Sequence, residues 1–238
     1  MEIERVSTGV DELDKLIEGG IPVGSNILLV GPPGVGKTIF VLAFTSKAIA
    51  NGDCCIYVCV DQLPEEVQYS LQKFGLNVKS AQDEGRLIFI DVYSWRFGKI
   101  PKDKRWYVSN IVNLNELLIR ISEAMKSINE KFPEKRIRIV LDSISTLIMY
   151  AEFIPVFKML QLLAARSKLM KAVGLYTLEA GVHEPKVSAG ISYIMDGVIE
   201  MKWEGEKRYI RILKMRATTH RRDWIPFEID EEGIKLKI

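Results

Sequence analysis

Eight consecutive residues near the start of the chain match the pattern G-x-x-x-x-G-K-[S/T], and no other feature constrains the fold as strongly. They are Gly31-Pro32-Pro33-Gly34-Val35-Gly36-Lys37-Thr38. The glycines let backbone N–H groups turn inward around phosphates, and a helix that starts near Lys37 directs its positive dipole end at them. Lys37 is predicted to reach the β- and γ-phosphates, and Thr38 to ligate Mg²⁺. We therefore expect this loop to bind a nucleoside triphosphate.

Strand and helix patterns alternate along most of the chain, and the loop lies at one strand-to-helix junction. Apolar runs predict buried strands at 26–30, 55–60, 86–92, 137–141 and 173–178. Spacing and end signals predict helices at 38–50, 64–74, 114–130 and 153–170. Further short strands are predicted at 197–203, 208–215, 224–229 and 233–237. The pattern predicts an α/β fold in a single domain, 1–238: a mostly parallel twisted sheet, helices on both faces and a C-terminal antiparallel strand flank.

Charge and composition exclude several classes of protein. With 33 Lys plus Arg and 31 Asp plus Glu, the formal net charge is only +2, which excludes a uniformly basic nucleic-acid wrapper. No apolar run approaches the ~18 residues of a membrane helix, and the first residues lack the apolar core of a secretory signal. Cys54, Cys55 and Cys59 lie within six residues, in or next to the predicted strand at 55–60, at spacings that do not suit a disulfide. We expect a cytoplasmic protein without a membrane partner.

An acidic residue at the end of another buried strand is expected to complete a metal site. Asp142 directly follows the predicted strand at 137–141. Beside a phosphate-binding loop, an aspartate in such a position holds Mg²⁺. A strand-terminal Asp can also simply cap the next turn, so Asp142 alone carries little weight. Together with the loop at 31–38, the metal role is favoured.

Beyond the loop, four short segments form a recognisable combination over nearly the whole chain. They are STGVDELD at 7–14, GGIPVG at 19–24, DEGRL at 83–87 and KMRATTH at 214–220. With them the chain resembles the RecA superfamily, and most of all single-domain relatives of the circadian clock protein KaiC and of RadA-type recombinases. The last segment is similar to their K-L-R-G-T-S-H ending. The resemblance implies a RecA-like P-loop NTPase that binds ATP with Mg²⁺.

The resemblance also implies an assembly. In such proteins the nucleotide lies between subunits of a hexamer-like ring or a filament, and a Lys and an Arg from the late segment reach the neighbour's γ-phosphate. The matching residues here are Lys214 and Arg216. Residues two apart on a strand point to the same side, which supports a shared role. The alternative is an exposed strand face that carries solvated charges.

The sequence departs from these families at the residues that handle water. In these families, two glutamates and then a Pro come at the end of the strand that follows the phosphate-loop helix. Here Asp61 and Gln62 occupy the positions of the two glutamates, and Pro64 follows them. Asp reaches less far than Glu, and Gln orients water but does not accept a proton. Slow ATP hydrolysis is therefore expected. Glu179 matches a family position that senses the γ-phosphate.

Three other interpretations stay open. The chain is expected to act either as an ATPase or as a nucleotide-gated module that presents a surface to an unknown protein partner. Two basic segments, 207–222 and 96–105, are candidates for single-stranded DNA, as in a DNA-stimulated ATPase, although the loop expected at 180–190 has only one basic residue. Ser192 lies close to where the clock protein carries a phosphorylated Ser, and it is expected just before a strand.

Overall fold

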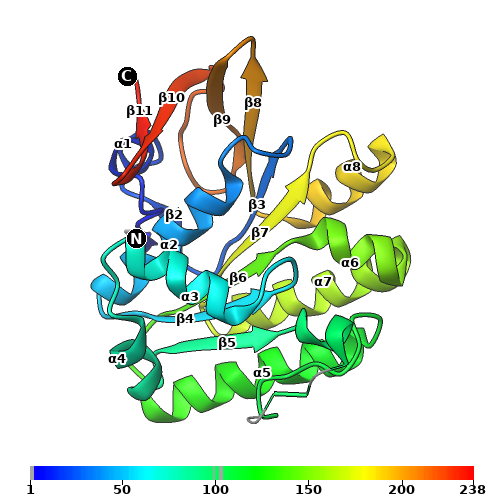
Figure 1. Ribbon diagram of the computed structural model, residues 1–238. Helices are drawn as coiled ribbons and strands as arrows, with labels where there is room; N and C mark the ends of the chain where they lie inside the picture. Colours follow the sequence, from blue (N-terminus) through cyan, green and yellow to red (C-terminus); the bar gives the residue numbers. More distant parts are fainter. Residues whose placement is uncertain (1–2, 99, 102–103) are drawn as a thin grey trace.

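The computed structural model describes residues 3–98, 100–101 and 104–238. Within them, a twisted sheet has the strand order β11-β10-β9-β8-β3-β7-β6-β4-β5 (Figure 1). The strands from β8 to β5 in this order pair in parallel, and β9, β10 and β11 add an antiparallel flank. Their bounds are β3 Asn26–Gly31, β4 Cys54–Cys59, β5 Leu87–Asp91, β6 Ile137–Asp142, β7 Val173–Glu179, β8 Gly197–Glu204, β9 Lys207–Met215, β10 Ile225–Asp230 and β11 Gly233–Leu236. The predicted fold class and all nine predicted strands are confirmed.

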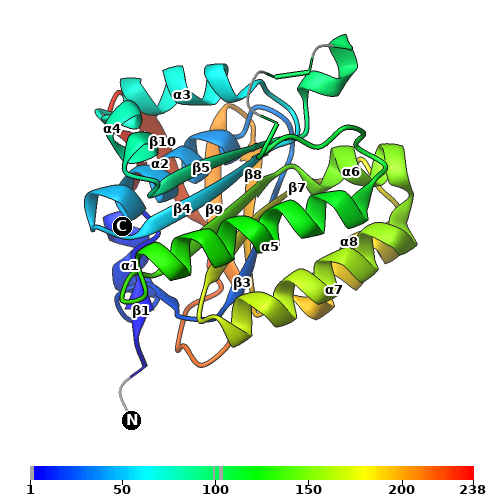
Figure 2. The ribbon, with the colours of Figure 1, turned by 90° about the horizontal axis from the view of Figure 1, so that it is seen from below.

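Helices cover both faces of this sheet (Figures 1 and 2). One face carries α1 (Asp11–Leu16), α2 (Lys37–Ala50), α3 (Pro64–Lys73) and α4 (Val78–Asp83). The other carries α5 (Leu114–Lys131), α6 (Ile144–Ala151), α7 (Phe153–Leu169) and α8 (Pro185–Ile194). No helix in the described ranges is long and apolar enough to cross a membrane.

Strand β4 explains why a continuous apolar run predicts a central strand. Cys55, Tyr57 and Cys59 pack into the core under α2, and the alternate residues Cys54 and Ile56 pack into the core under α5. Because both faces are covered, every position must be apolar. The three cysteines are free and buried, and burial raises the pKa of the Cys55 thiol to about 12.

Several elements differ from the prediction. The segment expected as a loop at 180–190 enters α8 at Pro185, and Ser192 lies inside that helix instead of before a strand. Val187 and Ile191 anchor α8, since residues four apart share a helix face. The basic segment 96–105 overlaps a 3₁₀ turn, η1 (Ser94–Phe97), which was not predicted. The remaining unpredicted elements are α1, α4, α6 and the paired strands β1 (Arg5–Val6) and β2 (Ile21–Pro22).

A buried ion pair joins the start of β6 to the chain before β4. Arg138 is 1% exposed, and its Nε and Nη2 donate to Asp53 Oδ2 at 3.0 and 2.7 Å. Its Nη1 donates to the carbonyl of Ser7 at 2.6 Å. The guanidinium also lies 4.9 Å from the centre of the Phe44 ring. Each of the three guanidinium nitrogens therefore donates to an oxygen, which offsets the cost of burying the cation.

We predict that Asp53→Ala lowers the free energy of unfolding by about 3–5 kcal/mol, because the Arg138 charge stays buried without its carboxylate. Urea denaturation of both proteins measures the difference. As a matched control, Glu130→Ala breaks the exposed Lys126–Glu130 pair and is expected to cost less than about 0.5 kcal/mol. Equal losses in the two variants would contradict the prediction.

Candidate functional site

The parallel register sets the predicted site residues side by side at the carboxyl edge of the sheet. Gly31 of β3 pairs with Glu179 of β7, and Cys59 of β4 pairs with Asp142 of β6. A cleft of about 490 Å³ opens at this edge. Its lining residues are Gly34, Gly36, Lys37, Thr38, Ile39, Asp61, Gln62, Asp142, Glu179, Arg208 and Ile229.

The loop before α2 has the features of an anion site. Gly34 and Gly36 have φ angles of 73° and 122°, which favour glycine. A Cβ on Gly36 would lie 2.8 Å from Ile229 Cδ1, so space as well as φ requires glycine there. Among the residues that the structure describes, no side chain caps the start of α2, and its first turn carries no acid. The first N–H groups of the helix are left for a ligand, and phosphate fits them.

Lys37 is held by oxygen atoms of its own chain. Its ammonium is 6% exposed and donates to the carbonyls of Gly31 and Pro32 at 2.8 and 3.0 Å, and to Glu179 Oε2 at 2.8 Å. The backbone N–H of Glu179 in turn donates to Ser145 Oγ at 2.8 Å. All three ammonium hydrogens have a protein partner. A phosphate oxygen would take the place of one of these three protein oxygens.

Asp142 lies at the floor of the cleft. Its Oδ1 accepts from Thr177 Oγ1 at 2.5 Å, and Tyr57 Oη lies 3.4 Å from Oδ2. Burial raises the pKa of the Asp142 carboxyl to about 6 against the opposing hydrogen bond of Thr177, and the negative charge of Asp61 adds to the rise. Thr38 and Asp142 both bring oxygen atoms to the cleft, and oxygen is the ligand that Mg²⁺ prefers.

Asp61 and Gln62 follow β4 and line the same cleft. Asp61 Oδ2 accepts from Ser143 Oγ at 2.7 Å. The preceding residue, Val60, donates its N–H to the Asp142 carbonyl at 3.1 Å. The departure from a Glu-Glu pair therefore falls on residues that the fold brings to the cleft.

Lys214 and Arg216 do not line the cleft of their own chain. Lys214 Nζ donates to the carbonyls of Ser192 and Met195 at 3.1 and 2.6 Å, at the C-terminal end of α8. Arg216 Nη1 pairs with Asp196 Oδ1 at 3.0 Å. Burial, with the Arg216 charge added, lowers the pKa of Lys214.

Three residues at the cleft were not predicted, and one of them, Ile39, directly follows Thr38 on α2. Arg208 and Ile229 come from β9 and β10 of the antiparallel flank. The Arg208 guanidinium lies 4.3 Å from the centre of the Trp203 ring, and its Nε is buried without a hydrogen-bond partner among the described residues. In the sequence, Arg208 is one of many cations in the basic segment 207–222, so no pattern singles it out.

The basic segments have partners within the chain. Arg211 in the first segment pairs with Glu200 at 2.5 Å and stacks on Trp224 at 4.3 Å. Arg208 and Arg216 have the contacts given above. Of the second segment, 96–105, residues 99 and 102–103 lie outside the described part of the chain. These contacts reduce the charge that is free to meet single-stranded DNA.

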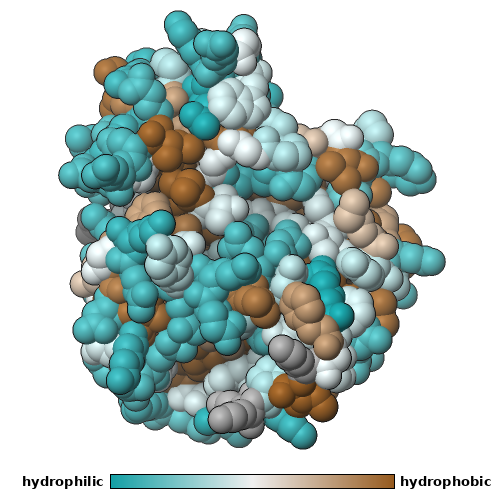
Figure 3. All heavy atoms as spheres, in the orientation of Figure 1, coloured by the Kyte–Doolittle hydropathy of each residue, from teal (hydrophilic) through white to brown (hydrophobic). Residues whose placement is uncertain are grey.

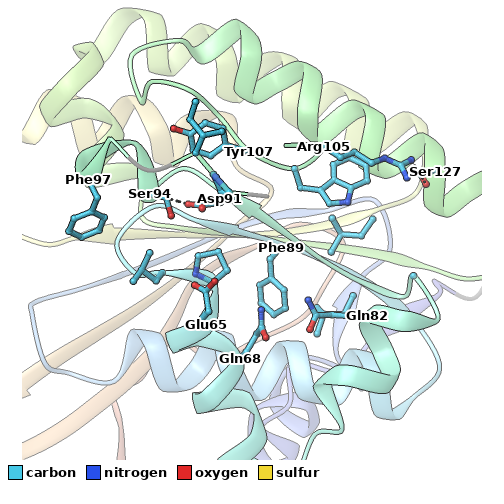
Figure 4. Close-up of a pocket in the computed structure, with 18 of the residues that line it drawn as sticks. Glu65, Gln68, Gln82, Phe89, Asp91, Ser94, Phe97, Arg105, Tyr107 and Ser127 are labelled. Atoms are coloured by element: carbon cyan, nitrogen blue, oxygen red, sulfur yellow. Dashed lines mark hydrogen bonds between the residues drawn. The ribbon is translucent and has the colours of Figure 1, made fainter. Parts of the chain in front are cut away.

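A second and larger cavity, of about 980 Å³, lies along the outer edge of β5 (Figure 4). Figure 4 shows Glu65 and Gln68 of α3 on one side, and Arg105 with Ser127 of α5 on the other. Figure 3 shows hydrophobic side chains in a hollow of this face, between α3 and α5. The two cavities are adjacent along the chain. Asp61 and Gln62 line the first cleft, and Leu63, Pro64 and Glu65, which follow them directly, line this larger cavity.

Comparisons with known proteins identify the family of this chain. The family model described as ATPase: KaiC matches residues 6–237. This chain belongs to the KaiC family of ATPases. A crystal structure of a KaiC-like protein from Pyrococcus horikoshii superposes with a TM-score of 0.80 at 27% identity, covering 100% of both chains. A UPF0273 protein of Aeropyrum pernix is 30% identical over 98% of this chain and 93% of its own length. One from Methanopyrus kandleri is 29% identical over 99% and 93%. Membership of this family implies nucleotide binding.

We predict that Asp142 makes the nucleotide- and metal-free protein less stable as pH rises. Its folded pKa of about 6 lies above the ordinary 3.8, so the fold loses stability between those pH values. The loss between pH 4 and pH 7 should be about 2 kcal/mol larger in the wild type than in Asp142→Asn. Urea denaturation at both pH values measures it, and parallel pH profiles would contradict the prediction.

Proposed function

We propose that the chain is a Mg²⁺-dependent ATPase with slow turnover, and that it works in a homo-oligomeric ring or filament with ATP between subunits. The observation that carries the proposal is the buried Lys37 ammonium beside an uncapped helix start, in one cleft with Asp142 and Asp61. A site for phosphates, oxygen ligands for a cation and a carboxylate for water are thus within one cavity.

Each residue has a chemical task in this proposal. Lys37 exchanges the Glu179 carboxylate for a phosphate oxygen, and the first N–H groups of α2 hold the others. Thr38 and Asp142 hold Mg²⁺, which when bound neutralises charge on the phosphates. Asp61, fixed by Ser143, orients the water that attacks the γ-phosphorus as the bond to the ADP oxygen breaks. Gln62 supplies a second hydrogen bond to that water.

The proposed slow turnover follows from the length of the Asp61 side chain. It is one methylene shorter than the Glu of related ATPases, and a misplacement of about 1 Å can cost about a hundredfold in rate. The alternative function is a nucleotide-held module that presents a surface to a protein partner. Such a module would operate with ATP bound and with little turnover.

The assembly is proposed from Lys214 and Arg216. Both cations lie away from the cleft of their own chain, and among the described residues their side chains form hydrogen bonds with the segment 192–196. In an assembly, Lys214 and Arg216 could reach the phosphates bound by a neighbouring subunit. There they would stabilise the phosphoryl group during its transfer.

We expect Lys37→Ala to lower phosphate release from ATP by at least about a hundredfold, because the site loses its charged donor to the phosphates. Phosphate release and bound nucleotide are measured in parallel. Lys47→Ala removes an exposed lysine of the same helix and should keep wild-type turnover. Unchanged turnover in Lys37→Ala would refute the proposed site, whereas bound ATP without turnover in the wild type would favour the nucleotide-held module.

Mixing two inactive variants tests the action in trans. A Lys37→Ala subunit still offers Arg216, and an Arg216→Ala subunit still offers an intact loop. Co-assembled, they form some complete sites between subunits, so phosphate release should recover to a measurable fraction of the wild type. If Arg216 acts within its own chain, the mixture will be as inactive as its parts. A wild-type turnover in Arg216→Ala alone would remove any role for that residue.

A further inference from the structure

A short turn beyond the edge strand β5 reaches back to the strand that carries Asp61. The turn is η1 (Ser94–Phe97), and it is fixed at its start by Asp91. Asp91 Oδ1 accepts from the backbone N–H groups of Tyr93 and Ser94, both at 2.9 Å. Figure 4 shows the Asp91–Ser94 contact as a dashed line, at the wall of the larger cavity. The turn is therefore anchored to the sheet and holds Arg96 in a defined position.

Arg96 points to the end of β4 and not to an acid. Its Nη1 donates to the carbonyl of Val60 at 3.0 Å. The guanidinium lies 4.3, 5.8 and 5.6 Å from the ring centres of Tyr93, Trp95 and Tyr150. Within the described ranges no carboxylate forms an ion pair with it. Aromatic faces and one carbonyl thus hold this cation, which stacked arginine permits.

The Val60 carbonyl belongs to the peptide group that carries the nitrogen of Asp61. Val60 is fully buried, and its N–H is bound by the Asp142 carbonyl. The carbonyl of Cys59 just before it accepts from the N–H of Val92 at 3.0 Å. Arg96 therefore supplies the last hydrogen bond to the strand before the chain leaves the sheet at Asp61.

The aromatic rings around Arg96 also connect the two groups that hold Asp61, which are Arg96 and Ser143. The backbone before Asp61 is held by Arg96, and its carboxylate is held by Ser143. Ser143 caps α6, and Tyr150 near the end of α6 covers the Arg96 guanidinium. The Trp95 and Tyr150 rings pack edge to face at 5.7 Å, which ties η1 to α6 directly.

We propose that Arg96 is a positioning residue for Asp61: by holding the Val60 carbonyl it sets where the Asp61 carboxylate stands over the cleft. The proposal rests on the proposed ATPase function, in which Asp61 orients the attacking water. Arg96 does not line the nucleotide cleft, so it acts through Asp61 and touches no phosphate.

The first test separates positioning from binding. In Arg96→Ala, kcat for ATP should fall about tenfold or more, while the dissociation constant for ATP stays within about twofold, because Asp61 shifts and the loop at 31–38 does not. Arg96→Lys, which keeps a donor for the carbonyl, should recover part of the rate. Arg120→Ala is the control: Arg120 on α5 pairs with Glu116 and Glu123, away from the cleft. It should leave both constants unchanged.

Two results would overturn the proposal. One is a wild-type kcat in Arg96→Ala. The other is a parallel loss of ATP binding and turnover together with a lower unfolding temperature, which is the pattern of a purely structural residue. If Arg96→Ala does not fold at all, the folded Arg96→Lys variant decides instead, through its kcat at saturating ATP and its dissociation constant for ATP.

A second measurement needs no turnover. Hydrogen–deuterium exchange in the nucleotide-free protein should be faster at 60–65 in Arg96→Ala than in the wild type or in Arg120→Ala, since the last strand contact is lost. Unchanged exchange over 60–65 would overturn the proposal. If the wild type releases no phosphate, the proposed function fails, and the exchange result alone then decides whether Arg96 anchors Asp61.

Discussion

The parallel pairing of β3, β7, β6 and β4 is the constraint from which the site follows. Because these strands are parallel and pair in a fixed register, their carboxyl ends lie side by side at one edge of the sheet. The phosphate loop leaves β3, Glu179 ends β7, Asp142 ends β6, and Asp61 follows β4. No loop has to travel far to bring these side chains together, and each rests on a strand that is buried on both faces. Such support is what holds a charged site rigid.

This arrangement buries charged side chains, and each buried charge is stabilised by a different set of partners. Arg138, far from the cleft, has a carboxylate, a carbonyl and a ring. Lys37, within the cleft, has two carbonyls and a carboxylate that a ligand can replace. Asp142 accepts hydrogen bonds from the hydroxyl groups of Thr177 and Tyr57, and burial raises the pKa of its carboxyl to about 6 although the Lys37 charge opposes the rise. A bound cation would add a positive charge beside this carboxylate.

The strands and long helices could be predicted from the sequence because apolar runs and helical spacing are local signals. The loop at 31–38, Asp142 and Asp61 could be named for the same reason, since each follows a recognisable strand. The contact between Lys37 and Glu179 could not, because it depends on which strand lies beside β3. Arg208 and Ile229 were missed because an antiparallel hairpin far along the chain brings them to the cleft. Arg96 was counted only as one charge among several, whereas its aromatic neighbours come from two separate segments.

The three protein oxygens around Lys37 make the resting site complete in itself. An incoming anion does not find an unsatisfied ammonium; it competes with the Glu179 carboxylate for one that is already neutralised. The net gain from this ammonium is then the difference between two ion pairs, and it is smaller than the gain from the new pair alone. The displaced carboxylate stands at the end of β7, six residues before Pro185 opens α8. In the proposed exchange, a phosphate at the loop would leave the Glu179 carboxylate unpaired at the end of the strand that precedes α8.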